Sequence, residues 1–402
     1  MGDYPSYKPD GMWPILLIYS LFSFLLDNTQ STGESIYRTS QWMRNLFIYE
    51  GFVDYFPIIT HRTVQLPASI NYITKTKRCL PPWTRALPSK LIRQLKYFGV
   101  LKEKERNYLD EIPVGPRYIF ACHPHGVISF GITGALCWGG KSEIYETIIE
   151  DDEIIEKKEN CVGESHTLTS SKSFVSLFSN IPTHLLTLTT QFKLPFYRDY
   201  IMALGVGLVT KCGIKSILKR WHSVAIVVGG AHESLLARPG SNRIVLNRRK
   251  GFIKIALEEC TKIEKDRNND ESFIEKGEWN SEMSDIAIVP VYAFGENNIH
   301  NVFNTVEGQK SQNSQISNTM RIFLKFQLTL KKYTGFTIPI VNSRSIFNYD
   351  FGLLPYKRRI DVVFGEPIYI YRKFGAKVGD KVTESEVNYY HELYKERLLK
   401  LC

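Results

Sequence analysis

The sequence predicts an α/β protein with a mostly parallel sheet flanked by helices. Four short apolar runs, each typical of a strand buried on both faces, end in a glycine beside polar residues. Helical patterns lie between these runs, for example at residues 213–220 and 250–257. Strands that alternate with helices favour a parallel sheet. The chain has 402 residues, 43% hydrophobic and 23% charged, which is enough for an ample core.

The composition excludes several classes of protein. Seven cysteines are dispersed without a C-x-x-C pair, so neither a disulfide scaffold nor a structural zinc finger is expected. The mean hydropathy of -0.19 excludes a polytopic transporter. A net charge of +10 favours an anionic partner, such as nucleic acid, anionic lipid or a phosphorylated ligand. Because no nucleic-acid-binding motif accompanies the basic residues, we do not expect nucleic acid.

The uncharged apolar segment at residues 12–26 indicates membrane attachment. Its length as a helix is about 22 Å, shorter than the roughly 30 Å hydrocarbon core of a bilayer. It therefore re-enters the membrane, lies in its interface, or borrows flanking residues; a cleaved signal peptide or a buried core helix is the alternative. A dense aromatic cluster at residues 42–57 is either a core-packing element or a lipid-facing surface. We expect residues 1–57 to form a membrane-associated N-terminal part.

Residues 58–402 are expected to form the main domain. Two polar stretches, at about 141–170 and 260–285, have the composition of solvated insertions. The first is rich in acidic residues and then in serine and threonine. The second is rich in Lys, Asp, Asn and Glu, with few apolar residues.

The four predicted strands are residues 118–122, 224–228, 286–294 and 360–364. In parallel α/β sheets, ligands bind outside the carboxyl ends of the strands. We therefore expect the four strand ends to converge on one crevice. The polar residues that follow the strands are the first site candidates: His123, His125, His232, Glu233, Glu296 and Glu366.

The sequence His-Pro-His-Gly after the first strand carries the most chemistry. The proline keeps His123 extended, so His125 is expected on the same side, and Gly126 permits a sharp turn. Two imidazoles at the mouth of a sheet suit general-base catalysis on a hydroxyl group. A structural role in backbone hydrogen bonding is the alternative, and a zinc site completed by His232 or Glu233 is a second one.

Glu233 and a group of basic residues follow the second strand. A carboxylate in this position can orient an imidazole or stabilise its protonated form; satisfying a helix dipole is the alternative. Arg249, Lys250 and Lys254 lie near a predicted helix start, which suits phosphate binding. A solvated helix face is the alternative for these three residues.

These motifs together resemble the diacylglycerol acyltransferase type 2 family, which includes monoacylglycerol and wax-alcohol acyltransferases. The likeness runs from about Asp27 to the C-terminus and looks closest to the fungal branch. Apart from the His-Pro-His-Gly turn, no single motif is specific to the family, but the order and spacing of the motifs together are highly specific. The other motifs lie at residues 54–57, 194–200, 227–235, 249–254, 289–296 and 352–355.

The resemblance implies a glycerolipid-acyltransferase-like fold and transfer of an acyl group from acyl-CoA to diacylglycerol. It implies a membrane enzyme of the endoplasmic reticulum, found also on lipid droplets, with its catalytic face in the cytosol. We expect His125 or His123 as the base, with Glu233 in support. Acyl-CoA is a co-substrate, no cofactor or metal is expected, and an oligomer is compatible with the family. The further binding residues are expected to be Gly126, Gly229 and Gly230 at an oxyanion hole, Arg249, Lys250 and Lys254 at the CoA phosphates, and Glu296.

Several alternatives stay open beside this interpretation. The acceptor could be monoacylglycerol or a fatty alcohol, and a non-catalytic lipid-droplet lipid carrier is the rival from another class. A serine hydrolase is disfavoured because no G-x-S-x-G sequence is present. The His-x4-Asp box of distant relatives would need an acid at Ile128 or Phe130, so Glu233 is the candidate replacement. The family usually has two apolar segments before the catalytic region, whereas this sequence shows one.

Overall fold

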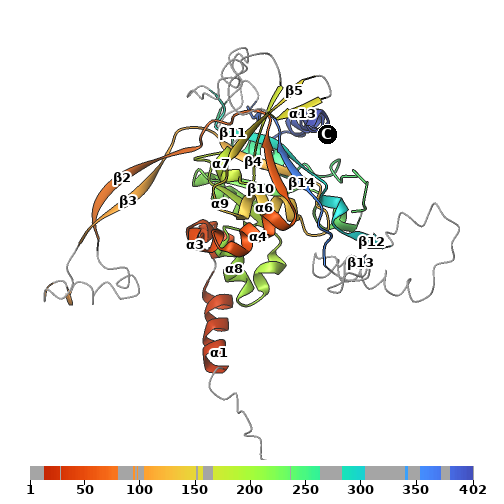
Figure 1. Ribbon diagram of the computed structural model, residues 1–402. Coiled ribbons are helices and arrows are strands. Elements are labelled where there is room, and N and C mark those ends of the chain that lie inside the picture. Colours follow the sequence, from red (N-terminus) through yellow and green to blue (C-terminus); the bar gives the residue numbers. More distant parts are fainter. Residues whose placement is uncertain are drawn as a thin grey trace, which may run out of the picture.

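A large sheet between two layers of helices forms the body of the protein, as seen in its computed structural model (Figure 1). The structure describes residues 13–27, 29–79, 94–95, 97, 104–150, 153–156, 166–235, 237–262, 283–303, 340–342, 354–372 and 381–401. The predicted α/β class with a mostly parallel sheet is confirmed.

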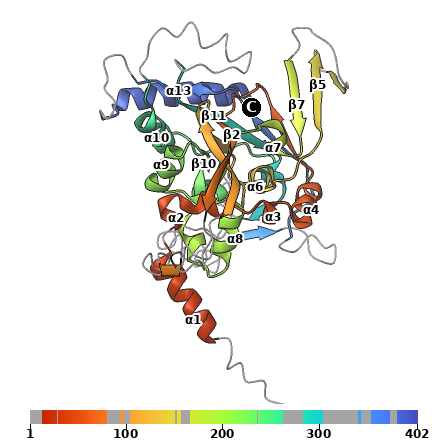
Figure 2. The same ribbon diagram turned by 90° about the vertical axis from the view of Figure 1, so that its left-hand side faces the viewer.

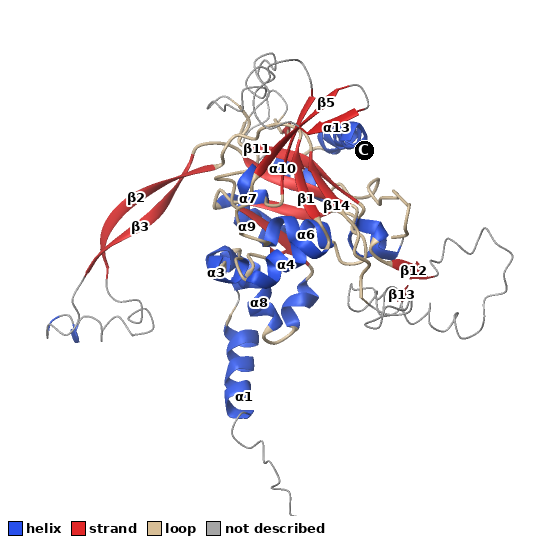
Figure 3. Cartoon of the chain, in the orientation of Figure 1, coloured by secondary structure: helices blue, strands red, loops and turns tan. Residues whose placement is uncertain are grey.

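The main sheet has the strand order β6-β5-β7-β1-β14-β11-β4-β10-β8-β9, with β15 paired to β11. Two small antiparallel ribbons, β2 with β3 and β12 with β13, lie apart from it. Figure 3 shows the β2–β3 ribbon projecting from the body. The strands are β1 (Ile58–Arg62), β2 (Ile70–Cys79), β3 (Lys104–Pro113), β4 (Arg117–His123), β5 (Ile144–Glu150), β6 (Glu153–Glu156), β7 (His166–Ser171), β8 (Thr183–Thr187), β9 (Gly207–Leu208), β10 (Ser223–Val227), β11 (Ile286–Phe294), β12 (Asn301–Phe303), β13 (Ile340–Asn342), β14 (Ile360–Phe364) and β15 (Ile368–Tyr369).

Strand direction decides which predicted strand ends meet. Strands β11, β4, β10, β8 and β9 are mutually parallel neighbours, so their carboxyl ends share one edge of the sheet. Strand β14 runs antiparallel to β11. Its carboxyl end, with Glu366, therefore lies at the opposite edge, where Glu366 pairs with Arg397. The expectation that all four strand ends converge is wrong for this strand.

The helices cover both faces of the sheet, and an apolar core lies on each face. One core lies against α9, α10 and α13, and the other against α4, α6 and α7. The α-helices are α1 (Trp13–Leu21), α2 (Thr29–Thr32), α3 (Gln41–Arg44), α4 (Phe47–Tyr55), α6 (Phe130–Cys137), α7 (Phe174–Leu177), α8 (Tyr197–Ala203), α9 (Lys211–Lys219), α10 (Gly251–Glu259) and α13 (Glu384–Leu401). Short 3-10 helices are η2 (Glu34–Arg38), η4 (Thr189–Lys193), η5 (Gly230–Leu235) and η7 (Glu296–Asn298), and a π-helical turn, η1 (Phe22–Leu26), continues α1.

Helix α1 projects from the body, as both views show (Figures 1 and 2), and none of its residues is buried. Trp13, Ile15 and Ile18 are each more than 60% exposed. The alternative that this segment is a buried core helix is therefore wrong. Within the described residues, no helix has both the length and the apolar character needed to cross a membrane.

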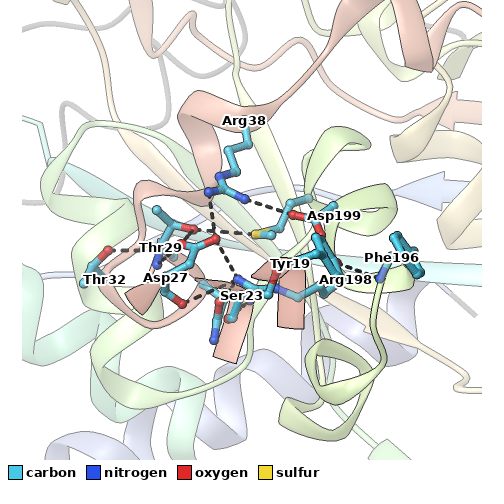
Figure 4. A network of polar contacts seen from close by, with 11 residues as sticks. Tyr19, Ser23, Asp27, Thr29, Thr32, Arg38, Phe196, Arg198 and Asp199 are labelled. Carbon is cyan, nitrogen blue, oxygen red and sulfur yellow. Dashed lines mark hydrogen bonds and ion pairs between the residues drawn. The ribbon is translucent and has the colours of Figure 1, made fainter. Parts of the chain in front are cut away.

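A buried polar network ties the end of this apolar segment to helix α8 (Figure 4). Arg198 is fully buried, and its Nη2 lies 2.9 Å from the Asp27 carboxylate and 2.6 Å from Gln30 Oε1. Arg38 also pairs with Asp27, at 2.7 Å, and with Asp199. The network fixes the direction in which α1 leaves the body.

The aromatic cluster at residues 42–57 is divided between core and surface. Phe52 and Phe56 pack on Phe130 of α6, with ring centroids 5.5 and 5.0 Å apart. Trp42 and Phe47 are instead 72% and 84% exposed. The core-packing interpretation is therefore confirmed for Phe52 and Phe56, whereas a lipid-facing surface stays a prediction for the exposed Trp42 and Phe47.

The two polar stretches differ in what the structure describes. The stretch at 141–170 includes β5, β6 and the start of β7, and these strands extend the edge of the main sheet. Most of the stretch at 260–285 lies outside the described residues.

Candidate active site

The carboxyl ends of β4, β10 and β11 lie side by side and bring together most of the predicted site residues. Strand β4 leads into the turn at residues 123–126, β10 into Gly229 and Gly230, and β11 into Gly295 and Glu296. The parallel pairing of β4 with both neighbours places these three turns at one edge. Three of the four predicted strand ends therefore meet at one edge of the sheet.

His123, at the end of β4, is fully buried. Its Nε2 lies 3.1 Å from the hydroxyl oxygen of Tyr394, and its Nδ1 has no hydrogen-bond partner among the described residues. Burial lowers the pKa of His123 to about 4, so the ring is neutral at neutral pH. The expectation that both imidazoles stand at the mouth of the sheet is wrong for His123.

His125 is partly exposed. Its Nδ1 lies 3.2 Å from the carbonyl oxygen of Gly126. A carbonyl only accepts hydrogen bonds, so Nδ1 carries the proton in the neutral ring and Nε2 carries a lone pair. Burial lowers the pKa of His125, partly opposed by the contact with the Gly126 carbonyl, which favours the lone-pair-bearing neutral form at neutral pH. Of the two histidines, His125 has the geometry of a base.

Glu233 lies beneath this turn and is buried. Burial raises the pKa of its carboxyl group to about 7, although the backbone N–H groups of His125 and Val245 and the charge of Arg249 act in the opposite direction. A β-carbon at Gly229 would lie 1.2 Å from Glu233 Oε2, so the carboxylate fills the space that only a glycine leaves open. Glu233 is thus a buried acid near the backbone of His125, and neither of its carboxylate oxygens has a hydrogen-bond partner of good geometry among the described residues.

Glu296, which we expected in substrate binding, is engaged by the protein itself. Its Oε1 and Oε2 accept hydrogen bonds from the backbone N–H groups of Phe130 and Gly131, each at 2.7 Å. These groups form the first turn of α6, whose N-terminal N–H groups have no partner within the helix. Burial raises the pKa of the Glu296 carboxyl to about 7 against these two donors. Glu296 therefore fastens the first turn of α6 to the end of β11, close beside Gly126 of the turn that carries His125.

The predicted basic cluster surrounds the start of α10. Arg249 Nη2 donates to the carbonyl of Gly229 at 2.9 Å, which places the guanidinium beside the second turn of the site. Lys250 Nζ donates to Asn388 Oδ1 at 2.7 Å, and Lys254, one helical turn further on, is exposed. The cluster is thus adjacent to the site and open to an anionic ligand.

A metal centre gains no support from the part of the chain that the structure describes. No group of three or more His, Cys, Asp or Glu side chains is placed there to hold an ion. His123 Nε2 is engaged with Tyr394, and the side chain of His232 lies outside the described set. A small polar pocket lies beside the turn, lined by Pro124, Ser241 and Asn297 among others.

Sequence reasoning missed Tyr394, which contacts the histidine turn from the last helix. The residue lies 271 positions from His123 in the sequence, and a tyrosine in an amphipathic helix is typical of a core-packing residue. No local signal distinguishes it.

Comparisons with known proteins agree with the resemblance found in the sequence. The family model described as "Diacylglycerol acyltransferase" matches residues 7–78, 161–264 and 282–402. These ranges include Glu233, the basic cluster and Glu296, and leave out the turn at residues 123–126. None of the solved structures matches the chain.

The relatives have acyltransferase names. "Diacylglycerol O-acyltransferase 1" of Saccharomyces cerevisiae is 33% identical over 392 residues, which cover 97% of this chain and 75% of the relative. The protein of the same name in Eremothecium gossypii is 32% identical, over 96% of this chain and 68% of the relative. "2-acylglycerol O-acyltransferase 1" of Bos taurus is 27% identical, over 97% of this chain and 80% of the relative.

Proposed function

The chain belongs to the diacylglycerol acyltransferase family, and we propose that it acylates diacylglycerol to triacylglycerol by direct transfer from the thioester, with His125 as the general base. The acyl donor is acyl-CoA, and the reaction is an O-acyl transfer. The observation that carries the role of His125 is its contact with the Gly126 carbonyl, which leaves Nε2 unprotonated on a partly exposed ring.

In this reaction His125 Nε2 takes the proton of the free hydroxyl of diacylglycerol. The hydroxyl oxygen forms a bond to the thioester carbonyl carbon, and the carbon–sulfur bond then breaks. The proton held on His125 passes to the leaving thiolate, so CoA departs as a free thiol and the base is restored. Backbone N–H groups near Gly126, Gly229 and Gly230 are the candidates for stabilising the oxyanion between these two events.

Glu233 supports the base from below. When ionised, its carboxylate favours the positive charge that His125 gains in the transition state, because the site excludes much of the water that would screen the interaction. The proximity of Glu233 to the backbone of His125 supports this role. Glu296 keeps its place in the site as the acceptor that holds the first turn of α6 at the end of β11.

Arg249, Lys250 and Lys254 would bind the phosphate groups of CoA. All three lie at or just inside the N-terminus of α10, where backbone N–H groups and the helix dipole also favour an anion. Arg249 contacts Gly229, so a phosphate held there would place the rest of the acyl-CoA within reach of the catalytic turn.

Membrane attachment is part of the proposal. Helix α1 carries no charged residue and buries none of its side chains on the body. The exposed Trp42 and Phe47 lie on the helices near its base (Figure 1). We expect α1 to enter one leaflet of the endoplasmic reticulum membrane or of a lipid droplet, with Trp42 and Phe47 at the interface and the basic cluster facing the cytosol.

Monoacylglycerol is a second candidate acceptor, because the relatives include 2-acylglycerol O-acyltransferases. The test is an assay of membranes that contain the protein, with labelled acyl-CoA and either diacylglycerol, monoacylglycerol or a fatty alcohol. The expected product with diacylglycerol is labelled triacylglycerol. Labelled free fatty acid as the sole product would contradict acyl transfer and favour hydrolysis.

A further inference from the structure

The C-terminal helix α13 reaches into the catalytic edge of the sheet through Tyr394. This residue is fully buried, and its hydroxyl donates to the carbonyl oxygen of Ala121 at 3.0 Å. The same hydroxyl oxygen lies 3.1 Å from Nε2 of His123. Tyr394 therefore contacts β4 at its last two inward-facing residues, immediately before the turn that presents His125.

This geometry fixes the tautomer of His123. The Tyr394 hydroxyl has one hydrogen, and the Ala121 carbonyl can only accept it. The tyrosine oxygen must then accept from His123, so the proton of the neutral imidazole resides on Nε2. Nδ1 is left as a bare acceptor in a buried place, which agrees with its lack of a partner among the described residues. A second proton on Nδ1 would lack an acceptor there, so the ring stays neutral.

Two other polar residues on the same face of α13 contact the basic cluster and the segment that leads to it. Asn388 accepts a hydrogen bond from Lys250 Nζ at 2.7 Å. His391 Nε2 lies 3.2 Å from the carbonyl oxygen of Leu246. The spacing of Asn388, His391 and Tyr394 is three residues each time, so the three form one stripe along the helix. Figure 2 shows α13 running past α10, against which it packs.

We propose that Tyr394 is a positioning residue for acyl transfer, which holds His123 in one tautomer and thereby fixes the turn that presents His125. In the same helix, Asn388 positions Lys250, so α13 sets the spacing between the basic cluster and the base. This inference rests on the proposed roles of His125 and the basic cluster. The polar side chains of α13 contact both β4 at the histidine turn and the basic cluster. This supports a positioning role better than a packing role, for which apolar residues would suffice.

The first test replaces Tyr394 by phenylalanine, which keeps the ring that packs on Phe252 and removes the hydroxyl. Triacylglycerol synthesis is measured at varied acyl-CoA and varied pH. We expect kcat to fall about tenfold or more with KM for acyl-CoA unchanged, since small displacements of a base are costly. The step that His125 contributes to the acid side of the kcat profile, apart from the step near pH 7 set by Glu233, should also shift upward, because a loosened turn exposes His125 and relieves the burial that lowers its pKa.

The matched control is Tyr389→Phe, which removes a hydroxyl from a residue of α13 that is 47% exposed. This variant should keep wild-type kcat, KM and pH profile. If Tyr394→Phe also keeps the wild-type kcat and pH profile, the proposal is overturned. It is equally overturned if the loss of kcat matches the loss of folded protein, measured by near-UV circular dichroism, with the pH profile unmoved.

Asn388→Ala gives an independent test at a partly exposed position. It should raise KM for acyl-CoA several-fold with kcat retained, because Lys250 loses its partner. An unchanged KM would refute the role of Asn388. Failure of the proposed function is distinguished from these results by the wild-type protein and its His125→Ala variant. If the wild type makes no triacylglycerol, or if the His125→Ala variant is active, the proposed function or the role of His125 is wrong, and this is seen without any substitution at Tyr394.

Discussion

The carboxylate of Glu296 fills the space beside Gly126 in which any other residue would place its β-carbon. A β-carbon at this position would lie 2.6 Å from Cγ of Glu296. Gly126 also has a φ of +55°, in the left-handed region that favours glycine. Because both Glu296 oxygens hold the first turn of α6, the carboxylate cannot move away without releasing that helix.

Gly126→Ala should therefore displace the turn that carries His125. We expect kcat to fall by about tenfold or more, because the base is misplaced, and stability to fall by about 1–3 kcal/mol from backbone strain. Gly51→Ala is the control, since no atom lies within 4 Å of its added β-carbon and it sits in helix α4. That change should leave activity intact and stabilise the protein slightly. Equal effects of the two substitutions would refute the packing argument.

Gly229 and Glu233 should behave as one unit. An alanine at 229 would collide with the carboxylate of Glu233 and drive it out of its place under the turn. We expect Gly229→Ala to reduce kcat strongly in the wild-type protein and to have little additional effect in a Glu233→Ala background. The measurement is a double-mutant cycle on kcat. Two effects that simply add would show that Gly229 acts on the reaction by another route.

The pH dependence of the rate should report on Glu233. With a pKa of about 7, raised by burial, the supporting anion forms as the pH rises through 7, so the rate should rise there. Glu233→Gln should be slower and lack this limb. Glu366→Gln, at the opposite edge of the sheet, is the control and should keep it. Persistence of the limb near pH 7 in Glu233→Gln would assign it to another group.

The same substitution should change stability with a defined sign. The folded-state pKa of Glu233 is raised above its ordinary value of 4.5, so the carboxyl favours the folded state below that value. This contribution is lost as the pH rises through 7. Relative to the wild type, Glu233→Gln should therefore raise Tm more at pH 8 than at pH 5. The opposite ordering of the two differences would contradict burial as the cause.

The buried pair of Arg198 and Asp27 should control the anchoring of α1. Arg198→Met removes one of the two arginines that pair with the buried Asp27, and we expect a loss of about 3–5 kcal/mol in the free energy of unfolding. Arg38→Met removes a side chain that is 33% exposed and should cost about 0–1 kcal/mol. Denaturant titration of both variants in detergent measures this difference. Equal losses of unfolding free energy in the two variants would show that the fully buried Arg198 contributes no more to stability than the partly exposed Arg38.

The sequence predicts the positions of the buried strands but not their directions. Strands β4, β10 and β11 were predicted nearly to the residue, because both faces are buried and the apolar runs are therefore continuous. The direction of β14 was predicted wrongly, because an apolar run has the same pattern in either direction. Glu366 was therefore placed at the wrong edge of the sheet.

In the candidate site, too, some features follow from the sequence and others depend on tertiary packing. The sequence predicts which residues lie at the ends of the strands, because the order of the chain determines them. The difference between His123 and His125 was not, because burial depends on α13, which joins β4 only in the folded chain. Glu296 was predicted from its place after β11, yet its partners in α6 depend on tertiary packing.

The central claim is that His125 is the base, and its direct test is the rate of triacylglycerol synthesis by His125→Ala in membranes with labelled acyl-CoA and diacylglycerol. We expect a loss of at least about 100-fold in kcat, since a general base contributes about 100- to 10,000-fold. The variant should retain membrane association and wild-type circular dichroism, because the His125 side chain is partly exposed and its hydrogen bond goes to the neighbouring Gly126 carbonyl. A folded His125→Ala protein with the wild-type rate would contradict the account.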